Sequence, residues 1–273
     1  MKLNQKRFNT FRQGRINARA EARKQLVIRN NLEKRFYKRL NTLFRKFIKV
    51  QLHLYKEYGI YETDVAIQSL NEDLVPLMIS HYRRVFRVIY KQNEDKYYNK
   101  KAADEIYVFG RSHDFEELIE SYFRTKQLLL VGISARMANR IKNLIDTARA
   151  DNLTLPQIAQ QVANKFLPIS RNRAALIART ETHNAASFAN HRYHKTVESE
   201  LGVKMLKKWV ATNDARTRST HAAANGQTVD MNENFIVGGA EMEYAGDAKG
   251  GARNVINCRC IIIYSDEQDV VLD

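Results

Sequence analysis

The sequence predicts a chain that is mainly α-helical over its first two-thirds and ends in a small α+β module. The 273 residues include only 3 Pro and 11 Gly, and apolar residues before position 200 recur at spacings of three and four, which is the helical period. Seven of the glycines lie at or beyond Gly202, where short apolar runs replace that pattern. We expect three segments: 1–56, a basic arm and an amphipathic basic helix; 57–169, a helical region; and 170–273, the α+β module with its leading long helix.

The first segment combines a basic arm with one long helix. Residues 1–20 lack apolar periodicity, so we expect a flexible arm there, and a helix is expected from about Leu26. Basic side chains occupy one face of this helix, and such a helix either packs on the protein core or lies on a membrane surface. Its expected apolar face consists of Leu32, Phe36, Leu40, Leu43, Phe47, Val50 and Leu54.

Three further helices are expected between residues 64 and 150. The first covers residues 64–101, with Pro76 near its start or at a kink, and the second covers residues 113–126. The third is expected to follow Gly132, with Ser134 as its cap. We expect no strand before residue 200.

A capping box marks the next helix start. Thr154 is followed three residues later by Gln157, the spacing at which each side chain reaches the other's backbone. We expect this helix to end at Pro168, a second one to open at Ser170, and Gly202 to end that second helix.

The α+β module should contain short strands and one long loop. Strands are expected at 207–211, 227–229 and 255–264, with an irregular loop at about 230–254. Within that loop, Gly238-Gly239 indicates a turn.

The charge is concentrated at the N-terminal end. The net charge is +15, and residues 1–56 hold 17 Lys and Arg against only Glu21 and Glu33, which accounts for the whole excess. Contact with a polyanion such as double-stranded DNA would explain it, since Lys and Arg release counterions from phosphates. A solvated helix face or a docking surface for an acidic protein remains open. The expected nucleic-acid contacts are Arg12, Arg15, Arg19, Arg23, Lys24, Lys34, Arg35, Lys38, Arg39, Lys46 and Lys49.

Composition also restricts the compartment. The first 25 residues contain no apolar stretch of the kind that secretory signals have, and the longest apolar runs are too short to span a bilayer. With only 2 Cys, a disulfide scaffold is excluded and a reducing compartment is favoured. We expect a soluble chain that is made in the cytoplasm.

The two cysteines, Cys258 and Cys260, lie two residues apart on an apolar run. In a strand this spacing puts both side chains on one face, with Arg259 on the other. Two buried, reduced thiols that serve packing are one reading. The other is a zinc site in which His221 joins the two thiolates, with Asp214 or another histidine open as a further ligand, although zinc sites usually use a longer cysteine spacing.

The polar residues around the module favour structural roles. Asp214 can cap a short helix that carries His221, flanked by Arg216 and Arg218. An Asp–His pair can also act as base and orienter, but the neighbouring Ser219 does not face His221, so no catalytic residue is assigned.

Two other motifs stand on either side of that segment. Arg179 and Glu181 lie on the long helix and are expected to tie it to the strands. Glu241 and Glu243 have the Glu-x-Glu spacing of arginine-directed ADP-ribosyltransferases, a spacing that solvated loop glutamates also show.

Taken together, the motifs resemble the Mu F-like head-morphogenesis (minor head protein) family of tailed bacteriophages over about residues 130–264. The residues that carry the resemblance are Ala178-Arg179-Thr180-Glu181, Lys208-Trp209, Asp214 to Arg218, His221, Gly226 and Val255-Ile256-Asn257-Cys258-Arg259-Cys260. Ala245-Gly246-Asp247 stands where the family commonly has Pro-Gly-Asp.

The resemblance implies a minor capsid protein inside the phage head. It implies a few-copy component made alongside the portal in the host cytoplasm, with portal and capsid proteins and packaged DNA as partners, without a required cofactor. Its C-terminal module has a distant likeness to ADP-ribosyltransferases, which leaves an enzyme as the alternative. A membrane-surface protein is a third class, which only the basic helix supports.

Overall fold

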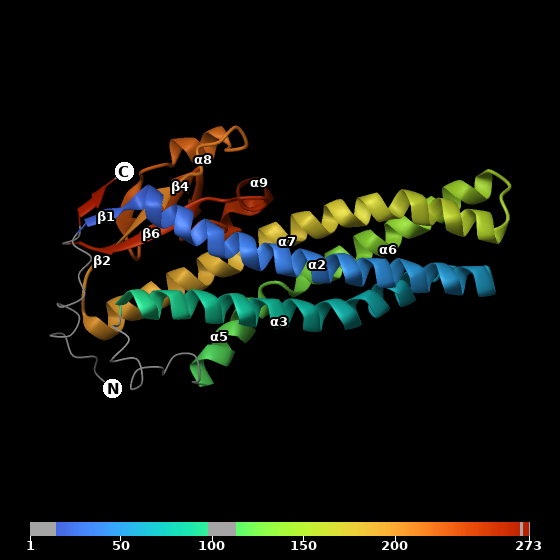
Figure 1. Ribbon diagram of the computed structural model, residues 1–273, viewed down its shortest axis with the longest axis horizontal. Coiled ribbons are helices and arrows are strands. Elements are labelled where there is room, and N and C mark those ends of the chain that lie inside the picture. Colours follow the sequence, from blue (N-terminus) through green and yellow to red (C-terminus); the bar gives the residue numbers. More distant parts are fainter. Residues whose placement is uncertain (1–14, 98–112, 268–269, 273) are drawn as a thin grey trace. The chain divides into compact units, whose positions relative to one another are not determined.

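The computed structural model describes residues 15–97, 113–267 and 270–272 (Figure 1). Apart from one short strand at its beginning, this part of the chain is helical up to residue 201, and short strands and helices follow, so the predicted fold class is confirmed. The helices of the first part are α2 (Ala18–Tyr58), α3 (Thr63–Tyr97), α5 (His113–Arg124), α6 (Gln127–Ala150) and α7 (Leu155–Leu201). The later elements are β2 (Met205–Val210), α8 (Ser219–Ala223), β3 (Thr228–Asp230), β4 (Phe235–Val237), β5 (Ala240–Met242), the 3₁₀ turn η1 (Ala248–Gly250), α9 (Gly251–Val255) and β6 (Ile261–Asp266).

A short strand at the N-terminal end corrects two expectations. β1 (Arg15–Asn17) pairs in parallel with β7 (Val270–Leu272), so a strand does occur before residue 200. α2 begins directly after it, at Ala18, because the Asn17 side chain caps the helix by accepting a hydrogen bond from the Ala20 amide at 2.8 Å. The expected flexible arm is therefore wrong for residues 15–20, and residues 1–14 lie outside the described part.

The chain divides into two compact units, each discontinuous in sequence. Unit 1 comprises Met1–Glu33, Arg84–Phe115 and Arg179–Asp273, and unit 2 comprises Lys34–Arg83 and Glu116–Ala178. The expected segments 1–56, 57–169 and 170–273 are continuous stretches of chain, and their boundaries stay a prediction.

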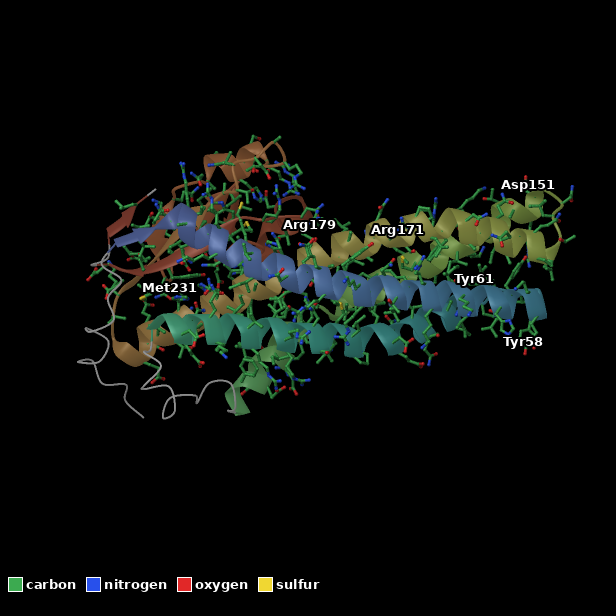
Figure 2. All side chains as sticks on the ribbon, in the orientation of Figure 1. Tyr58, Tyr61, Asp151, Arg171, Arg179 and Met231 are labelled. Atoms are coloured by element: carbon green, nitrogen blue, oxygen red, sulfur yellow. The ribbon has the colours of Figure 1, made fainter. Side chains whose placement is uncertain are left out.

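Unit 2 has an apolar helical core. Tyr61 is anchored there, since its hydroxyl donates to the Ala138 carbonyl at 3.0 Å (Figure 2). The expected apolar face of α2 holds at its beginning but fails at its end, where Val50 and Leu54 are 42% and 38% exposed. A helix has 3.6 residues per turn, so a set of positions chosen in steps of three and four moves gradually around the helix and away from the buried face. Toward the end of α2, side chains at other positions are therefore buried. Those buried instead are Phe44, Ile48, Leu52 and Tyr55.

Two helices are longer than expected. α6 begins at Gln127, so Gly132 and Ser134 lie inside it, and the Ser134 hydroxyl donates to Asn71 at 2.7 Å instead of capping a helix end. α7 is continuous through Pro168, which was expected to end a helix. One half of the expected capping box is present at its start, where the Gln157 side chain accepts from the Thr154 backbone amide at 2.9 Å. The Thr154 hydroxyl donates to the same Gln157 oxygen at 2.8 Å.

The strands of unit 1 form a small sheet and a hairpin. The sheet has the order β3-β2-β6 and is antiparallel, with Trp209 opposite Ile262. The region expected to be an irregular loop instead holds the β4–β5 hairpin, whose turn is Gly238-Gly239. The third expected strand is shorter than predicted, because α9 occupies its beginning and β6 starts only at Ile261.

Among the described residues, we find no helix with the length and apolar character needed to cross a bilayer.

Candidate functional site

The second half of α7 is buried in unit 1 on every side of the helix, and many of the side chains buried there are polar. Arg29 of α2 is 1% exposed and donates to the Ser187 hydroxyl at 2.9 Å and to Gln25 at 3.3 Å. Asn93 of α3 donates to Asn190 at 2.8 Å. Burial of a polar group costs free energy unless the group finds a partner, so these bonds stabilise the contacts of α2 and α3 with α7. The buried polar residues on α7 from position 180 onward are Thr180, Glu181, Thr182, His183, Asn184, Ser187, Asn190, His191 and His194.

The Arg179-Thr180-Glu181 motif connects α7 to the segment that carries the cysteines. Arg179 pairs with Glu33 at 3.2 Å and donates to the Asn257 side chain at 3.5 Å. The Asn257 amide donates to the Thr180 hydroxyl at 3.2 Å, and Asn257 has a φ of 60°, a conformation that Asn adopts more readily than most residues. Glu181 is buried on the same helix.

Asp214 belongs to a turn and binds Arg259. Two hydrogen bonds of 2.6 and 2.7 Å join the Arg259 guanidinium to the two carboxylate oxygens, and they hold the pKa of Asp214 well below its usual range. Asp214 also accepts from the Arg216 amide at 3.0 Å, but α8 begins only at Ser219, so the expected helix cap is wrong. Arg218 donates to the Ile256 carbonyl at 2.5 Å.

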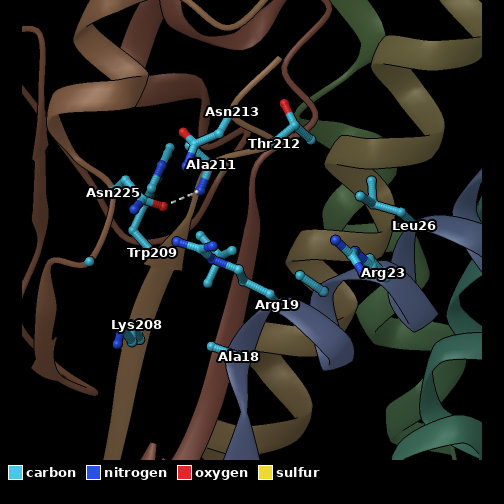
Figure 3. Close-up of a pocket in the computed structure, with 13 residues that line it drawn as sticks. Ala18, Arg19, Arg23, Leu26, Lys208, Trp209, Ala211, Thr212, Asn213 and Asn225 are labelled. Carbon is cyan, nitrogen blue, oxygen red and sulfur yellow. Dashed lines mark hydrogen bonds between the residues drawn. The ribbon is translucent and has the colours of Figure 1, made fainter. Parts of the chain in front are cut away.

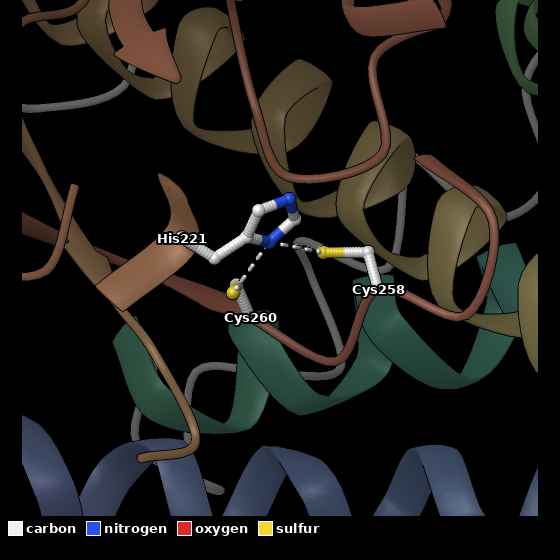
Figure 4. A group of neighbouring side chains, drawn as sticks. All are labelled: His221, Cys258 and Cys260. Carbon is white, nitrogen blue, oxygen red and sulfur yellow. Dashed lines mark hydrogen bonds between the residues drawn. The ribbon is translucent and has the colours of Figure 1, made fainter. Parts of the chain in front are cut away.

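His221, Cys258 and Cys260 meet in the interior of unit 1 (Figure 4). The Nδ1 atom of His221 lies 3.3 Å from the sulfur of Cys260 and 3.6 Å from that of Cys258, and the exposed fractions of the three residues are 2–4%. The Cys260 thiol donates to the Cys258 sulfur, which lowers the pKa of Cys258 and raises that of Cys260. Both thiols are free, as expected, and both face inward although they precede β6.

Trp209 forms the wall of this cluster. The indole is fully buried on β2 and meets the His221 ring edge-on, with 5.8 Å between the ring centroids, and the Phe235 ring at 5.4 Å. Gly226 pairs its backbone with Trp209 through a 2.8 Å bond and has a φ of 87°, which explains a glycine at this position.

The Ala245-Gly246-Asp247 turn approaches α7 closely. Gly246 has a φ of 91°, and an added Cβ would overlap the side-chain oxygen of Asn184. Asp247 is buried and accepts from the Glu243 and Lys249 amides at 2.9 and 3.1 Å, which shapes the turn. The alanine that replaces the family's usual proline therefore leaves a turn that is held by the aspartate.

The two glutamates of the Glu-x-Glu motif have partners at the surface. Glu243 binds Lys249 at 2.6 Å and lies 3.6 Å from the buried His191, and Glu241 accepts from Asn234 at 3.1 Å. Burial lowers the pKa of His191 to about 3, so this histidine is neutral at neutral pH.

Most of the expected nucleic-acid contacts are exposed on α2. Arg12 lies outside the described part, and nothing is described of the Arg15 side chain. The nine others are exposed: Arg19, Arg23, Lys24, Lys34, Arg35, Lys38, Arg39, Lys46 and Lys49. Among the ion pairs that the structure describes in unit 2, one involves a residue of this group: Lys46 lies 3.2 Å from Asp73.

A pocket of about 390 Å³ opens beside the first turns of α2 (Figure 3). Arg19, Arg23 and Lys208 line it together with Trp209 and Asn225, and no acidic residue is among the lining residues. In unit 2, a shallow depression of about 560 Å³ is lined by Lys38, Arg39 and Lys46, with Asp73.

Sequence reasoning missed several buried ionisable residues. Arg29 looks like one more cation of the basic helix, and its i, i+4 spacing from Gln25 was the available signal. His183 is 3% exposed, and burial, followed by the charges of nearby arginines, holds its pKa well below the usual value. Lys207 donates to the Glu243 carbonyl at 2.8 Å, and burial lowers its pKa to about 8.

Comparisons with known proteins match the part of the chain that holds this site. Residues 139–263 match the family described as Phage Mu protein F like protein. The chain is 29% identical to the minor head protein of Bacillus phage SPP1 over 245 residues, which are 82% of this chain and 75% of that protein. It is 32% identical to an NAD(+)–arginine ADP-ribosyltransferase, EFV, of Enterococcus faecalis over 127 residues. That second match covers 46% of this chain and only 26% of the transferase. No solved structure matches.

The matched region contains the α7 motif, the Trp209 strand and the His221–Cys258–Cys260 cluster, in the order that the sequence resemblance required. Residues 139–263 therefore form a Mu F-like region, and the chain is similar to a phage minor head protein over 82% of its length.

Proposed function

We propose that this chain acts in phage head assembly near the portal and contacts the packaged DNA through the basic face of α2. The observation that supports this most is the similarity to a phage minor head protein over 82% of the chain. Portal and capsid proteins are the partners that this role requires, and the interior of the virion is the location, after synthesis in the host cytoplasm.

Exposed charge supports the DNA contact. Nine of the expected contact residues point to solvent on α2, and a Lys or Arg that meets a phosphate releases bound counterions. Arg19 and Arg23 line the pocket of unit 1, and Lys38 and Arg39 line the depression of unit 2. Because none of these contacts requires a particular base, the proposed binding is independent of DNA sequence.

The salt dependence of duplex binding tests this contact. In one variant Arg35, Lys38 and Lys49 become Gln, and in a control variant of equal net charge the exposed Arg140, Lys165 and Arg171 become Gln (Arg171 is labelled in Figure 2). The slope of log K against log salt should fall in magnitude by about 3 in the first variant, at about 0.9 per phosphate contact, and stay near the original value in the second. Equal changes in both variants would show that net charge, and not this helix face, binds DNA.

We propose further that the chain is not an enzyme. The match to the ADP-ribosyltransferase and the Glu241–Glu243 spacing support the other candidate. A transferase needs a cation, Arg179 or another, on the cofactor phosphates, and Arg179 already pairs with Glu33. Cys258 and Cys260 are 4% and 3% exposed and therefore out of reach as nucleophiles.

Incubation with labelled NAD and host proteins separates the two candidates. No label should transfer. Transfer that disappears when Glu241 and Glu243 are both changed to Gln would establish the transferase and overturn the structural role.

A further inference from the structure

We propose that His221, Cys258 and Cys260 form a zinc site in which Nδ1 of the histidine and the two sulfurs bind one metal ion. The three donors come from two segments far apart in sequence, α8 and the residues before β6, yet their ligand atoms all lie within 4.8 Å of one another. One nitrogen faces both sulfurs, as Figure 4 shows. Packing alone does not require two thiols to share the same imidazole nitrogen.

The separations between the donors suit zinc. Zinc binds thiolate at about 2.3 Å and imidazole at about 2.0–2.1 Å in a tetrahedron, which places a nitrogen and a sulfur ligand about 3.5 Å apart. The observed distances from Nδ1 are 3.3 Å to Cys260 and 3.6 Å to Cys258. A metal ion would therefore need only small shifts of side chains.

The two segments are held together without the metal. Arg259, which lies between the cysteines, makes its paired bonds to Asp214, and Arg218 donates to the Ile256 carbonyl. The backbone amide of Asn257 donates a hydrogen bond to the Thr180 hydroxyl. These bonds surround the cluster and involve none of its three donors, so the backbone presents the donors in advance.

Charge and donor type favour zinc over other ions. Two thiolates and a neutral imidazole neutralise a divalent cation, so the complex carries no net charge in an interior where these residues are 2–4% exposed. Sulfur and imidazole ligands select zinc over magnesium or calcium, which prefer oxygen. Trp209 covers one side of the histidine ring.

The fourth position would be held by a small ligand. Among the described residues, no further His, Cys, Asp or Glu joins this group of donors. Zinc sites with three protein ligands complete the tetrahedron with water or another small molecule. The ion would cross-link α8 to the start of β6.

The full-length chain tests the proposal directly. It is purified under reducing conditions without added metal, its zinc content is measured by elemental analysis, and the metal is then exchanged for cobalt(II). We expect one zinc per chain and an intense near-ultraviolet band of thiolate-to-cobalt charge transfer. Because the chain has only 2 Cys, that band can arise from no other thiolate of the protein.

Variants assign the site. Zinc should fall to background in the double variant Cys258→Ser, Cys260→Ser and in His221→Gln, and stay at one per chain in the control His53→Gln, whose side chain is 72% exposed. If a variant does not fold, the cobalt spectrum of the unaltered chain still decides. Wild-type protein that holds no zinc and gives no thiolate band with cobalt, or zinc that survives in the double variant, would overturn the proposal and show a hydrogen-bonded cluster.

Discussion

The second half of α7 and the unit 2 part of α2 are buried in opposite ways: α2 buries one apolar face, whereas α7 is buried on every side and with many polar side chains. On α2 the buried side chains between residues 36 and 55 are almost all apolar, led by Phe36, Leu40 and Phe44. On α7 the residues from Thr180 to His194 bury hydroxyl, amide, imidazole and carboxylate groups instead. The first face is held by transfer of apolar area from water, and the second by individual hydrogen bonds.

The difference shows what each region tolerates. An apolar face accepts other apolar side chains of similar volume, because the attraction has no direction. A polar face depends on named partners, such as Arg29 for Ser187 and Asn93 for Asn190, and each lost partner leaves a buried polar atom. The matched family region includes this polar face.

The largest expected effect is on the apolar face. Phe44→Ala removes a fully buried ring and should lower the free energy of unfolding by about 3–5 kcal/mol, measured by denaturant titration with circular dichroism. The control on the same helix is Leu54→Ala, where the side chain is 38% exposed and the loss should stay below about 1 kcal/mol. Equal losses at the two positions would contradict the burial of Phe44 and the exposure of Leu54 that the structure shows.

A smaller effect is expected where the turn meets the polar face. Gly246→Ala combines a φ of 91° with a Cβ that overlaps Asn184, and should cost about 3 kcal/mol. Gly226→Ala, with a φ of 87° and open space, should cost only about 1–2 kcal/mol of backbone strain. The fluorescence of Trp209, the single tryptophan, follows unfolding of unit 1. If Gly226→Ala lowers the free energy of unfolding more than Gly246→Ala does, the close approach of the turn to α7 is not the reason for a glycine at position 246.

The apolar face was predictable from sequence, and the polar face was not. A period of three and four located α2, but it placed Val50 and Leu54 inside, because short windows do not fix the phase of a long helix. On α7 the buried side chains are polar, so no hydrophobic period marked them, and Pro168 was read as an end although the helix continues. Tertiary partners override both local signals.

The candidate site shows the same limit. The spacing of Cys258 and Cys260 indicated that both point one way, and the sequence order suggested His221 as their neighbour. The partners of Arg179 and Arg259, namely Glu33 and Asp214, lie far away in the chain, and no local pattern pairs them. Asp214 was read as a helix cap because capping is the commonest local use of such a residue.

The polar face should also make unit 1 sensitive to acid. The pKa of His191 is lowered to about 3 in the fold from an ordinary value near 6.5, so the unfolded chain binds a proton first as the pH falls. The contribution of His191 is complete above pH 6.5 and is lost toward pH 3, about 2 kcal/mol by pH 5.

Unfolding of the wild type and of His191→Gln, compared at pH 7.5 and pH 5, isolates this contribution. Glu243, Tyr264 and Lys207 interact with this histidine in the wild type at both pH values. The loss of stability between pH 7.5 and pH 5 is therefore measured for each protein separately, and the two losses are then compared. A wild type that loses no more stability than the variant would contradict the burial of a neutral imidazole.

The smallest effect is expected at the surface glutamates. Changing Glu241 and Glu243 to Gln breaks the exposed pair with Lys249 and should change the free energy of unfolding by less than about 1 kcal/mol, with head assembly nearly unaltered. A large loss of infectious particles with unchanged stability would instead point to a functional role for these carboxylates.

The central proposal is that this chain is an internal component of a phage head, and mass spectrometry of purified particles tests it most directly. DNA-filled heads should contain this chain beside the portal protein, in few copies relative to the major capsid protein. Heads that contain the portal and capsid proteins at full abundance and lack this chain would contradict the account.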